Sequence, residues 1–483
     1  MTVVATTPAA PVDPPHLGVP RIVLLSSYWV ALGFLWLPLG GQIIPIYVLH
    51  IVGDSLKGTG TAVLEAFGTF VAVFWQPVMG ALSDRTHTRF GRRKPFIFVG
   101  TIGSMLFLGL MALTPQFSNA TTTGPGALLA PAYLWLLLLY FLLQLSENAA
   151  QAPYQGLLPD VVPEEELSRA SSFVGAGNLV GIGAGVVVVG TLMGMGRPDL
   201  ALFTAAAALG LTMLIVVLVF PDKVAPAAGG RISWRELVVD TFRISPREHG
   251  DFLWLMASRL AILVAVAGLQ RYAVYYFKDV FYPGAGAALE EHASLAARDL
   301  QGVILGVAIL VSLPAGELSH RIGRKPLIVA SGILGAIGTV GLIGSPFPLL
   351  PDFATSPVAA LLGVPQTLAQ AMYFGVLVGL AAGMFLSVDW AFMVDLIPHE
   401  ESGRFLGFSN IATAGSGVLA GLMGGFLIDA FNARGHLLGQ PGGYPVTFAV
   451  YTVFFILGIF AVLKVRETRK GGRSLPPRPA AGH

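Results

Sequence analysis

Twelve apolar segments dominate the chain, and each is close to the roughly 20 residues that a membrane-spanning helix needs. They are continuous apolar runs rather than alternating apolar and polar positions, so the pattern predicts helices and excludes a membrane β-barrel. The predicted segments are 22–49, 60–83, 95–114, 131–155, 170–194, 200–220, 252–280, 300–318, 326–345, 367–393, 408–430 and 444–464. We therefore predict an all-α integral membrane protein with twelve transmembrane helices.

Two pairs of polar loops indicate that the chain is an internal duplication. A basic turn at 80–95 returns in shorter form at 316–326, and an acidic loop that begins at Asp160 returns 235 residues later at Asp395. Two independent loops at one offset predict two six-helix halves. The predicted parts are a disordered tail at 1–21, a first half at 22–220, a linker at 221–250, a second half at 251–466 and a second tail at 467–483.

Composition and charge support a membrane protein and fix its expected orientation. Hydrophobic residues make up 54% of the chain and charged residues only 12%, about half the share of a soluble protein. The basic turns, the linker and the C-terminal tail fall on one face, which the positive-inside rule assigns to the cytoplasm together with both termini. We expect an inner (cell) membrane location. The chain has no cysteine, and we expect no cofactor, metal or nucleic-acid partner.

Several motifs resemble those of a known transporter family. The turn from Asp84 to Arg93 resembles the signature loop of the major facilitator superfamily, and its extension through Ile97 resembles the sucrose-transporter and glycoside–pentoside–hexuronide cation symporter group. The stretches 148–160, 177–181 and 275–278 continue this resemblance.

The resemblance implies the major facilitator fold, no enzymatic activity, and alternating-access transport of a sugar or glycoside with a proton or sodium ion. Sucrose carriers have an Asp where this chain has Gln144 and an Arg where it has Gln155, so the resemblance does not extend to sucrose itself.

The basic turns and the acidic loops are expected to form a gating latch. We expect their contacts to exist only when the cytoplasmic ends of the halves are close together, which would favour the outward-open state. The alternative is that the basic residues only fix topology and bind lipid head groups. The expected latch residues are Asp84, Arg85, Gly91, Arg92, Arg93, Asp160, Arg321, Arg324, Asp395 and Arg404. His320 replaces Asp84 in the second copy, so we expect the first copy to be stronger.

A carboxylate in the fourth segment is the main candidate for ion coupling. At 100° per residue, Gln144, Glu147, Asn148, Gln151 and Gln155 share one arc of about 100° on this helix. Such a face should point to a cavity or another polar helix. A charged side chain in the membrane is energetically costly, so its presence indicates a function. We predict that Glu147 couples transport to a proton. A structural hydrogen-bond network is the alternative.

Other intramembrane charges admit more than one role. Arg271 is expected either to pair with Glu147 or to snorkel outward, and Arg259 to be an interfacial anchor. Asp389 is a second coupling candidate or part of an inner gate, and Glu65 is expected at a gate or rim.

Prolines and glycines break the first segment between Trp36 and Pro45, which is tolerated where a helix lines protein or a cavity. A kink needed for packing is the alternative. The substrate-binding candidates are Trp36, Gln42, Gln144, Asn148, Gln151, Gln155, Gln270, Arg271, Tyr275 and Trp390. A lipid-facing groove lined only with Leu and Phe, in place of a central cavity, would instead favour a non-transporting protein that delivers a hydrophobic pigment.

Overall fold

The computed structural model describes residues 16–86, 88–113, 124–222, 249–284, 286–397 and 402–466, with two short strands at 469–470 and 473–474. Within these residues, twelve helices are long and apolar enough to cross a membrane, which confirms the fold predicted from the hydrophobic pattern. The linker segment 223–248 and most of both tails lie outside the described residues, so their structure stays a prediction.

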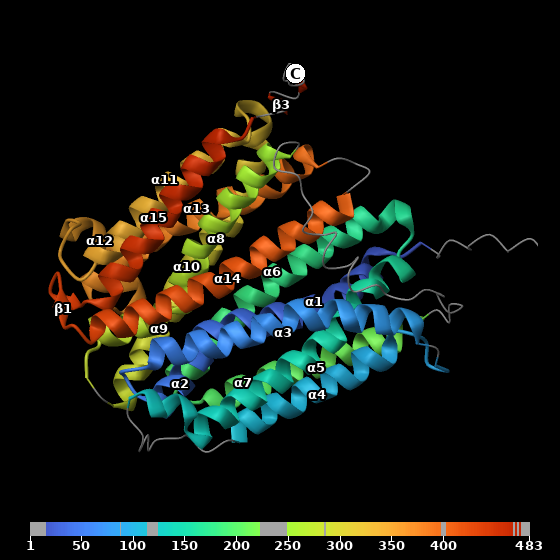
Figure 1. Cartoon of the computed structure of the whole chain (residues 1–483), viewed down its shortest axis with the longest axis horizontal. Helices are drawn as coiled ribbons and strands as arrows, with labels where there is room; N and C mark the ends of the chain where they lie inside the picture. The colour runs from blue at the N-terminus through green and yellow to red at the C-terminus, as the bar shows by residue number, and fades with distance from the viewer. Residues whose placement is uncertain are drawn as a thin grey trace, which may run out of the picture.

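The helices form two bundles, which Figure 1 shows in blue to green and in yellow to red. The first contains α1 Val19–Pro38, η1 Leu39–Ile43, α2 Ile44–Val52, α3 Lys57–Arg85, α4 Lys94–Leu113, η2 Pro125–Leu129, α5 Pro131–Val161, α6 Glu164–Gly194 and α7 Pro198–Val219. The second contains α8 Gly250–Arg271, α9 Ala273–Tyr276, η4 Phe277–Phe281, α10 Ala287–Ile322, α11 Lys325–Gly344, α12 Asp352–Leu362, α13 Gln366–Leu396, α14 Ser402–Asn432 and α15 Gly443–Lys464. Short strand pairs, β1 His436–Leu437 with β2 Gln440–Pro441 and β3 Arg469–Lys470 with β4 Arg473–Ser474, complete it.

Three elements differ from the sequence prediction. The seventh apolar segment is not one helix, because α8 ends at Arg271 and the chain continues as α9 and η4. The eighth span, α10, begins well before residue 300. A short helix, α12, lies between the ninth and tenth spans; its eleven residues are too few to cross a membrane, so a search for spanning segments does not find it.

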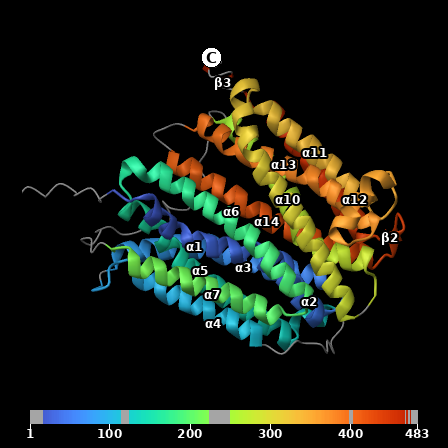
Figure 2. The same cartoon turned by 180° about the vertical axis from the view of Figure 1, so that it is seen from behind.

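The two bundles meet along two helix pairs, α3 with α14 and α6 with α10. We call the end that carries both basic turns the basic end; residues 17, 222, 249 and 466 also lie there. The other end, which includes the loops at 53–56 and 433–442, is the opposite end. Figures 1 and 2 show that the bundles lie together at the opposite end and diverge towards the basic end.

Small residues allow close packing inside each bundle. α6 runs along α1, and a Cβ on Gly181 would collide with the backbone of Val30. In lipid, such close helix contact relies on small residues.

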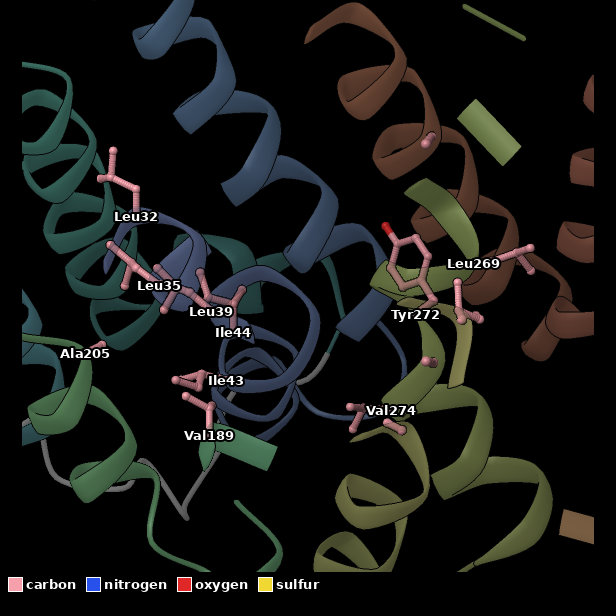
Figure 3. Close-up of a cluster of buried hydrophobic side chains, with 14 of the residues drawn as sticks. Leu32, Leu35, Leu39, Ile43, Ile44, Val189, Ala205, Leu269, Tyr272 and Val274 are labelled. Atoms are coloured by element: carbon pink, nitrogen blue, oxygen red, sulfur yellow. The ribbon is translucent and has the colours of Figure 1, made fainter. Parts of the chain in front are cut away.

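Both bundles interrupt their first long helix with a π-helical segment. In the first bundle, η1 lies between Pro38 and Pro45 and contains Gly40 and Gly41. In the second bundle, η4 follows α9 at the corresponding position. Apolar side chains hold these breaks in the core, as Figure 3 shows for Leu32, Leu35, Leu39, Ile43, Ile44, Val189, Ala205, Leu269, Tyr272 and Val274. Segments of π-helix occur frequently at functional sites.

Candidate functional site

A buried ion pair joins the two bundles near the middle of the molecule. Glu65 of α3 accepts from Arg271 of α8, with Oε2 and Nη2 2.5 Å apart, and both side chains are largely buried. Arg271 also donates from Nη1 to the carbonyl oxygen of Gly417 on α14 at 2.5 Å. Both expectations for Arg271 are wrong, because it neither pairs with Glu147 nor snorkels. Glu65 is buried rather than placed on a rim.

Two glycines, which have no side chain, leave room for this pair. A Cβ at Gly40 would lie 2.6 Å from Oε1 of Glu65, and a Cβ at Gly421 would lie 2.6 Å from Nη1 of Arg271. Oε1 of Glu65 is itself buried and has no hydrogen-bond partner among the described residues. The break in the first span thus places the backbone of Gly40 against the carboxylate of Glu65.

Glu147 is the other isolated carboxyl group. It is 0% exposed, and neither of its oxygens has a hydrogen-bond partner among the described residues. Trp36 of α1, which is half-buried, lies beside it. Burial without a partner strongly disfavours the charged form of a carboxyl group.

The polar arc on α5 changes character along the helix. Nε2 of Gln144 donates to the hydroxyl of Tyr140 at 3.1 Å, and Nδ2 of Asn148 donates to the carbonyl of Gln144 at 2.8 Å. Gln151 is half-buried and accepts from Gln76 of α3 at 3.2 Å, whereas Gln155 is exposed. The arc therefore runs from a buried network inside the first bundle to an exposed surface near the basic end.

Amides form a second connection between the bundles. Nε2 of Gln42, in η1, donates to Oε1 of Gln301 on α10 at 2.7 Å, and Nε2 of Gln301 donates to the carbonyl of Gln270 at 3.0 Å. Sequence reasoning missed Gln301, although it is a polar residue at the start of a predicted apolar segment.

Asp389 of α13 is paired inside the second bundle. It accepts from Nη1 of Arg259 on α8, and Arg259 also donates to Oγ1 of Thr413 at 3.1 Å. Arg259 is buried, so its expected role as an interfacial anchor is wrong. The neighbouring Trp390 points away from this pair and is 51% exposed.

A network of charges and hydroxyl groups closes the opposite end. Lys57 of α3 contacts both oxygens of Asp279 in η4 at 2.7 and 2.6 Å and Asp54 at 2.8 Å, and Tyr444 donates to Asp279 at 2.6 Å. We call Asp54, Lys57, Asp279 and Tyr444 the opposite-end cluster. The hydrophobic and charge pattern of the sequence did not single out Lys57.

Further contacts across the bundles reinforce this closure. Asp429 of α14 accepts from the backbone N–H groups of Gly58 and Thr59 at 3.0 and 2.6 Å, and so caps the start of α3. Tyr275 is fully buried and donates to the carbonyl of Pro45 at 2.7 Å, while its hydroxyl lies 2.8 Å from Thr61. Tyr275, a substrate-binding candidate, is therefore part of the closed end in this structure.

The basic turns make their described ion pairs within single bundles. Arg92 and Arg93 contact the carboxylate of Asp160 at 2.7 and 2.5 Å, and Arg93 contacts Asp84 at 3.0 Å. These pairs exist while the basic ends of the bundles are apart. The expectation that such contacts form only when those ends are close is wrong for these pairs.

The second basic turn, at 316–326, also makes its described ion pairs within its own bundle. Arg324 contacts Asp395 at 2.5 Å, and Arg321 contacts the exposed Glu317 of its own helix at 3.4 Å. Gly91 adopts a φ of 102°, and a Cβ there would collide with Asp222, which accepts from the N–H of Arg93. Arg85 is exposed, and the side chain of Arg404 lies outside the described part of the chain.

An apolar crevice of about 720 Å³ lies between the bundles on the basic side of the Glu65–Arg271 pair. Residues of α3, α8 and α14 line it, among them Phe70, Phe74, Met256, Leu260, Phe408 and Leu419. Ala66 and Val418, which also line it, directly follow Glu65 and Gly417 in the chain. The structure therefore has both this apolar crevice and the buried polar groups described above.

Comparison with known proteins identifies relatives among sugar carriers. A family model described as MFS/sugar transport protein matches residues 29–465. The General alpha-glucoside permease of Schizosaccharomyces pombe is 27% identical over 145 residues, which are 30% of this chain and 25% of the permease. Sucrose transport protein SUC4 of Arabidopsis thaliana is 26% identical over 182 residues, or 36% of this chain and 35% of that protein. These two matches thus span only a quarter to a third of the relatives. Sucrose transport protein SUT5 of Oryza sativa subsp. indica is 23% identical over 457 residues, or 84% of this chain and 81% of that protein.

Solved structures of transporters share the fold. A D-xylose-proton symporter superposes with a TM-score of 0.62 at 15% identity over 94% of this chain and 98% of the symporter. A bacterial homologue of the iron transporter ferroportin gives a TM-score of 0.64 in its inward-facing state and 0.52 in its outward-facing state. Identity is 15% in the first match and 16% in the second, and both cover 93% of this chain and 99% of that protein.

Proposed function

Because the chain belongs to the MFS/sugar transport protein family of the major facilitator superfamily, we propose that this secondary transporter carries a sugar or glycoside together with a proton. The proposal extends to location: the basic end faces the cytoplasm of a cell (inner) membrane, with both termini on that side. The described arrangement, closed at the opposite end and separated at the basic end, is then an inward-open state.

The observation that carries the coupling proposal is Glu147. A fully buried carboxyl group that makes no described ion pair, and has only the indole of Trp36 beside it, is stable when protonated and costly when charged. Binding a proton needs no further ligand, whereas a sodium ion needs several oxygen ligands around it. This favours a proton over sodium. The sucrose-transporter relatives support a sugar-like substrate.

We place the sugar site where the two bundles meet, between the opposite-end cluster and the diverging basic end. Trp36 offers an aromatic face for a sugar ring, and Gln144, Asn148, Gln151 and Gln270 offer amide donors and acceptors. Gln42 reaches this site once its bond to Gln301 is exchanged. Of the remaining candidates, Arg271 is held by Glu65 and the carbonyl of Gly417 in this state. Gln155, Tyr275 and Trp390 would contact substrate only on its way in or out.

The apolar crevice is the observation that favours a second candidate, the delivery of a hydrophobic pigment without transport. Its walls are almost entirely aliphatic and aromatic. Transport remains the better-supported function because the buried amides, the unpaired Glu147 and the Glu65–Arg271 pair provide a polar route that a pigment would not use.

Uptake by purified protein in liposomes tests the proposal. A panel of radiolabelled pentoses, hexoses, α- and β-glucosides and disaccharides is offered under an imposed pH gradient, and separately under a sodium gradient. We expect uphill accumulation of at least one sugar with the pH gradient. Accumulation with sodium alone would reject the proton, and no sugar uptake together with pigment co-purification would favour the second candidate.

Glu147→Gln is the decisive variant because it keeps size and hydrogen-bonding capacity but cannot release a proton. It should abolish uphill accumulation while exchange of substrate across the membrane continues. Glu147→Asp is the matched control, since it keeps the carboxyl group and should retain uphill accumulation. A Glu147→Gln protein that concentrates sugar as well as the unaltered protein would remove Glu147 from the coupling site.

A further inference from the structure

The Glu65–Arg271 pair joins groups that must separate during alternating access. Glu65 belongs to α3 of the first bundle, whereas Arg271 belongs to α8 and also bonds Gly417 on α14 of the second. When the opposite end opens, α3 moves away from α14, and Arg271 stays with the carbonyl of its own bundle. The pair is therefore specific to states in which the opposite end is closed.

The position of the pair relates it to that closure. Glu65 lies about 12 Å further along α3 than Lys57, at 1.5 Å per residue, and so lies directly inside the opposite-end cluster. On its other side lies the apolar crevice, which is lined by Ala66 and Val418. Water that enters through an opened opposite end reaches Glu65 early, while apolar residues separate it from the basic end.

Breaking the pair leaves Glu65 without a cation. Oε1 already has no partner among the described residues, and Oε2 is the oxygen that contacts Arg271. Removing the partner of a buried charge is strongly unfavourable, and binding a proton relieves that cost. Arg271 keeps its charge and its carbonyl partner.

The surrounding titratable groups do not take this role. Tyr140 of α5, Tyr272 of α8 and Tyr451 of α15 face the pair, with Asp429 of α14 beyond Tyr272. Tyr272 and Tyr451 donate to the carbonyls of Gly421 and Ala420, and tyrosines ordinarily ionise only near pH 10. Asp429 already accepts hydrogen bonds from two backbone N–H groups at the start of α3. Gly40 of η1 contributes no side chain.

We propose that Glu65 is a second proton-binding carboxylate, which exchanges Arg271 for a proton when the opposite end opens. The opposite end then opens more readily as pH falls, and closing it on Arg271 expels the proton. This inference rests on the proposed function, because it adds a second site to proton-coupled transport. It assigns Glu65 the link between protonation and conformation, and leaves Glu147 as a proton site inside one bundle.

A substrate-free distance measurement tests this. The chain has no cysteine, so Ser55→Cys and Ala433→Cys, both exposed at the opposite end of different bundles, can be spin-labelled in an otherwise unaltered protein. Pulsed electron paramagnetic resonance in nanodiscs gives the fraction of molecules with a long inter-label distance. We expect this fraction to rise as pH falls from about 8 to about 5, across the range in which a buried carboxyl group titrates.

Glu65→Gln should abolish this pH dependence and leave the long-distance fraction high at every pH. It is tested with and without His50→Gln, because His50 of α2 contacts Glu290 of α10 at 2.7 Å across the bundles at the same end. Arg271→Gln also breaks the pair but keeps the carboxyl group of Glu65, which is then costly to ionise while the opposite end is closed. In this variant the long-distance fraction should therefore no longer rise as pH falls. Glu65→Asp, which keeps the carboxylate, and Glu147→Gln should both retain the pH dependence. If the pair is only structural, the variants that break it should lower the melting temperature without altering the pH dependence of the long-distance fraction.

A long-distance fraction that still rises as pH falls in Glu65→Gln or Arg271→Gln overturns the inference, and so does a pH-independent distance in the unaltered protein. Because no sugar is present, a failure to find any transported sugar would sink the proposed function without changing this result.

Discussion

Lys57 should be the residue that most strongly holds the opposite end closed. Its ammonium group is 1% exposed and bridges from α3 to Asp279 of the second bundle, with Asp54 as a further partner. We predict that Lys57→Met keeps the fold but shifts the protein towards the state in which the opposite end is open. The contact with Asp279 exists only in the closed state, so its loss raises the free energy of that state alone.

The structure sets the size of this shift. Removing one partner of a buried ion pair costs about 3–5 kcal/mol. Asp54 is 70% exposed, so its contribution is small. Asp279 keeps the hydroxyl of Tyr444 and is 13% exposed, which softens its isolation. We therefore expect about 2 kcal/mol, which corresponds to a change of about thirtyfold in the equilibrium between the two states.

The spin-label pair at Ser55 and Ala433 measures this equilibrium directly. Lys278→Met is the matched control, because Lys278 is also buried but lies 3.8 Å from Asp279 and 3.4 Å from Asp54. It should change the equilibrium by less than about 1 kcal/mol. If the two variants shift the distance distribution equally, or if neither does, the closure does not depend on Lys57.

Three further predictions concern other charged groups. Asp389→Asn should destabilise the protein by about 3–5 kcal/mol in thermal unfolding, because Arg259 is left buried without its anion, whereas Asp389→Leu combined with Arg259→Met should be closer to neutral. Asp84→Asn should leave the protein folded and, if the latch operates, lower transport more than substrate affinity; cysteine-accessibility labelling that finds an unchanged inside/outside balance would contradict the latch. Burial alone would raise the pKa of Asp54, but the two neighbouring lysines outweigh it and hold this pKa below its ordinary value. Asp54→Asn should therefore reduce stability slightly, by less than about 1 kcal/mol, above pH 4, and have no effect once the pH falls below the lowered pKa, as thermal melts at a series of pH values will show.

Helix positions were predictable from the sequence because each span carries its own signal. Length and apolar content decide whether a segment crosses the membrane, and neither depends on a neighbour. The same holds for the break in the first span, since Pro38, Gly40, Gly41 and Pro45 act on the local backbone. The break between α8 and α9 has no such signature at Tyr272, and it was missed.

The partners of charged residues were not predictable in this way. Helical periodicity indicates which face of a helix is polar, but not which helix that face meets. Arg271 and Glu147 are both intramembrane charges, yet Arg271 meets Glu65 because α8 and α3 approach each other where the bundles join. Arg259 was misplaced for the same reason, since α13 covers it with Asp389.

The charges of this protein divide into those that join the bundles and those that do not, and only the first group can distinguish its states. A contact that is equally present in two conformations cannot shift the equilibrium between them. The pairs of Asp160 with Arg92 and Arg93 lie within one bundle, so their main effect is to hold the basic turn rigid. A latch at the basic end would need a further contact, and Asp84 is suited to make one because its side chain is 48% exposed. Closure of the opposite end and opening of the basic end would then be governed by different carboxylates, Asp279 and Glu65 in one case and Asp84 in the other.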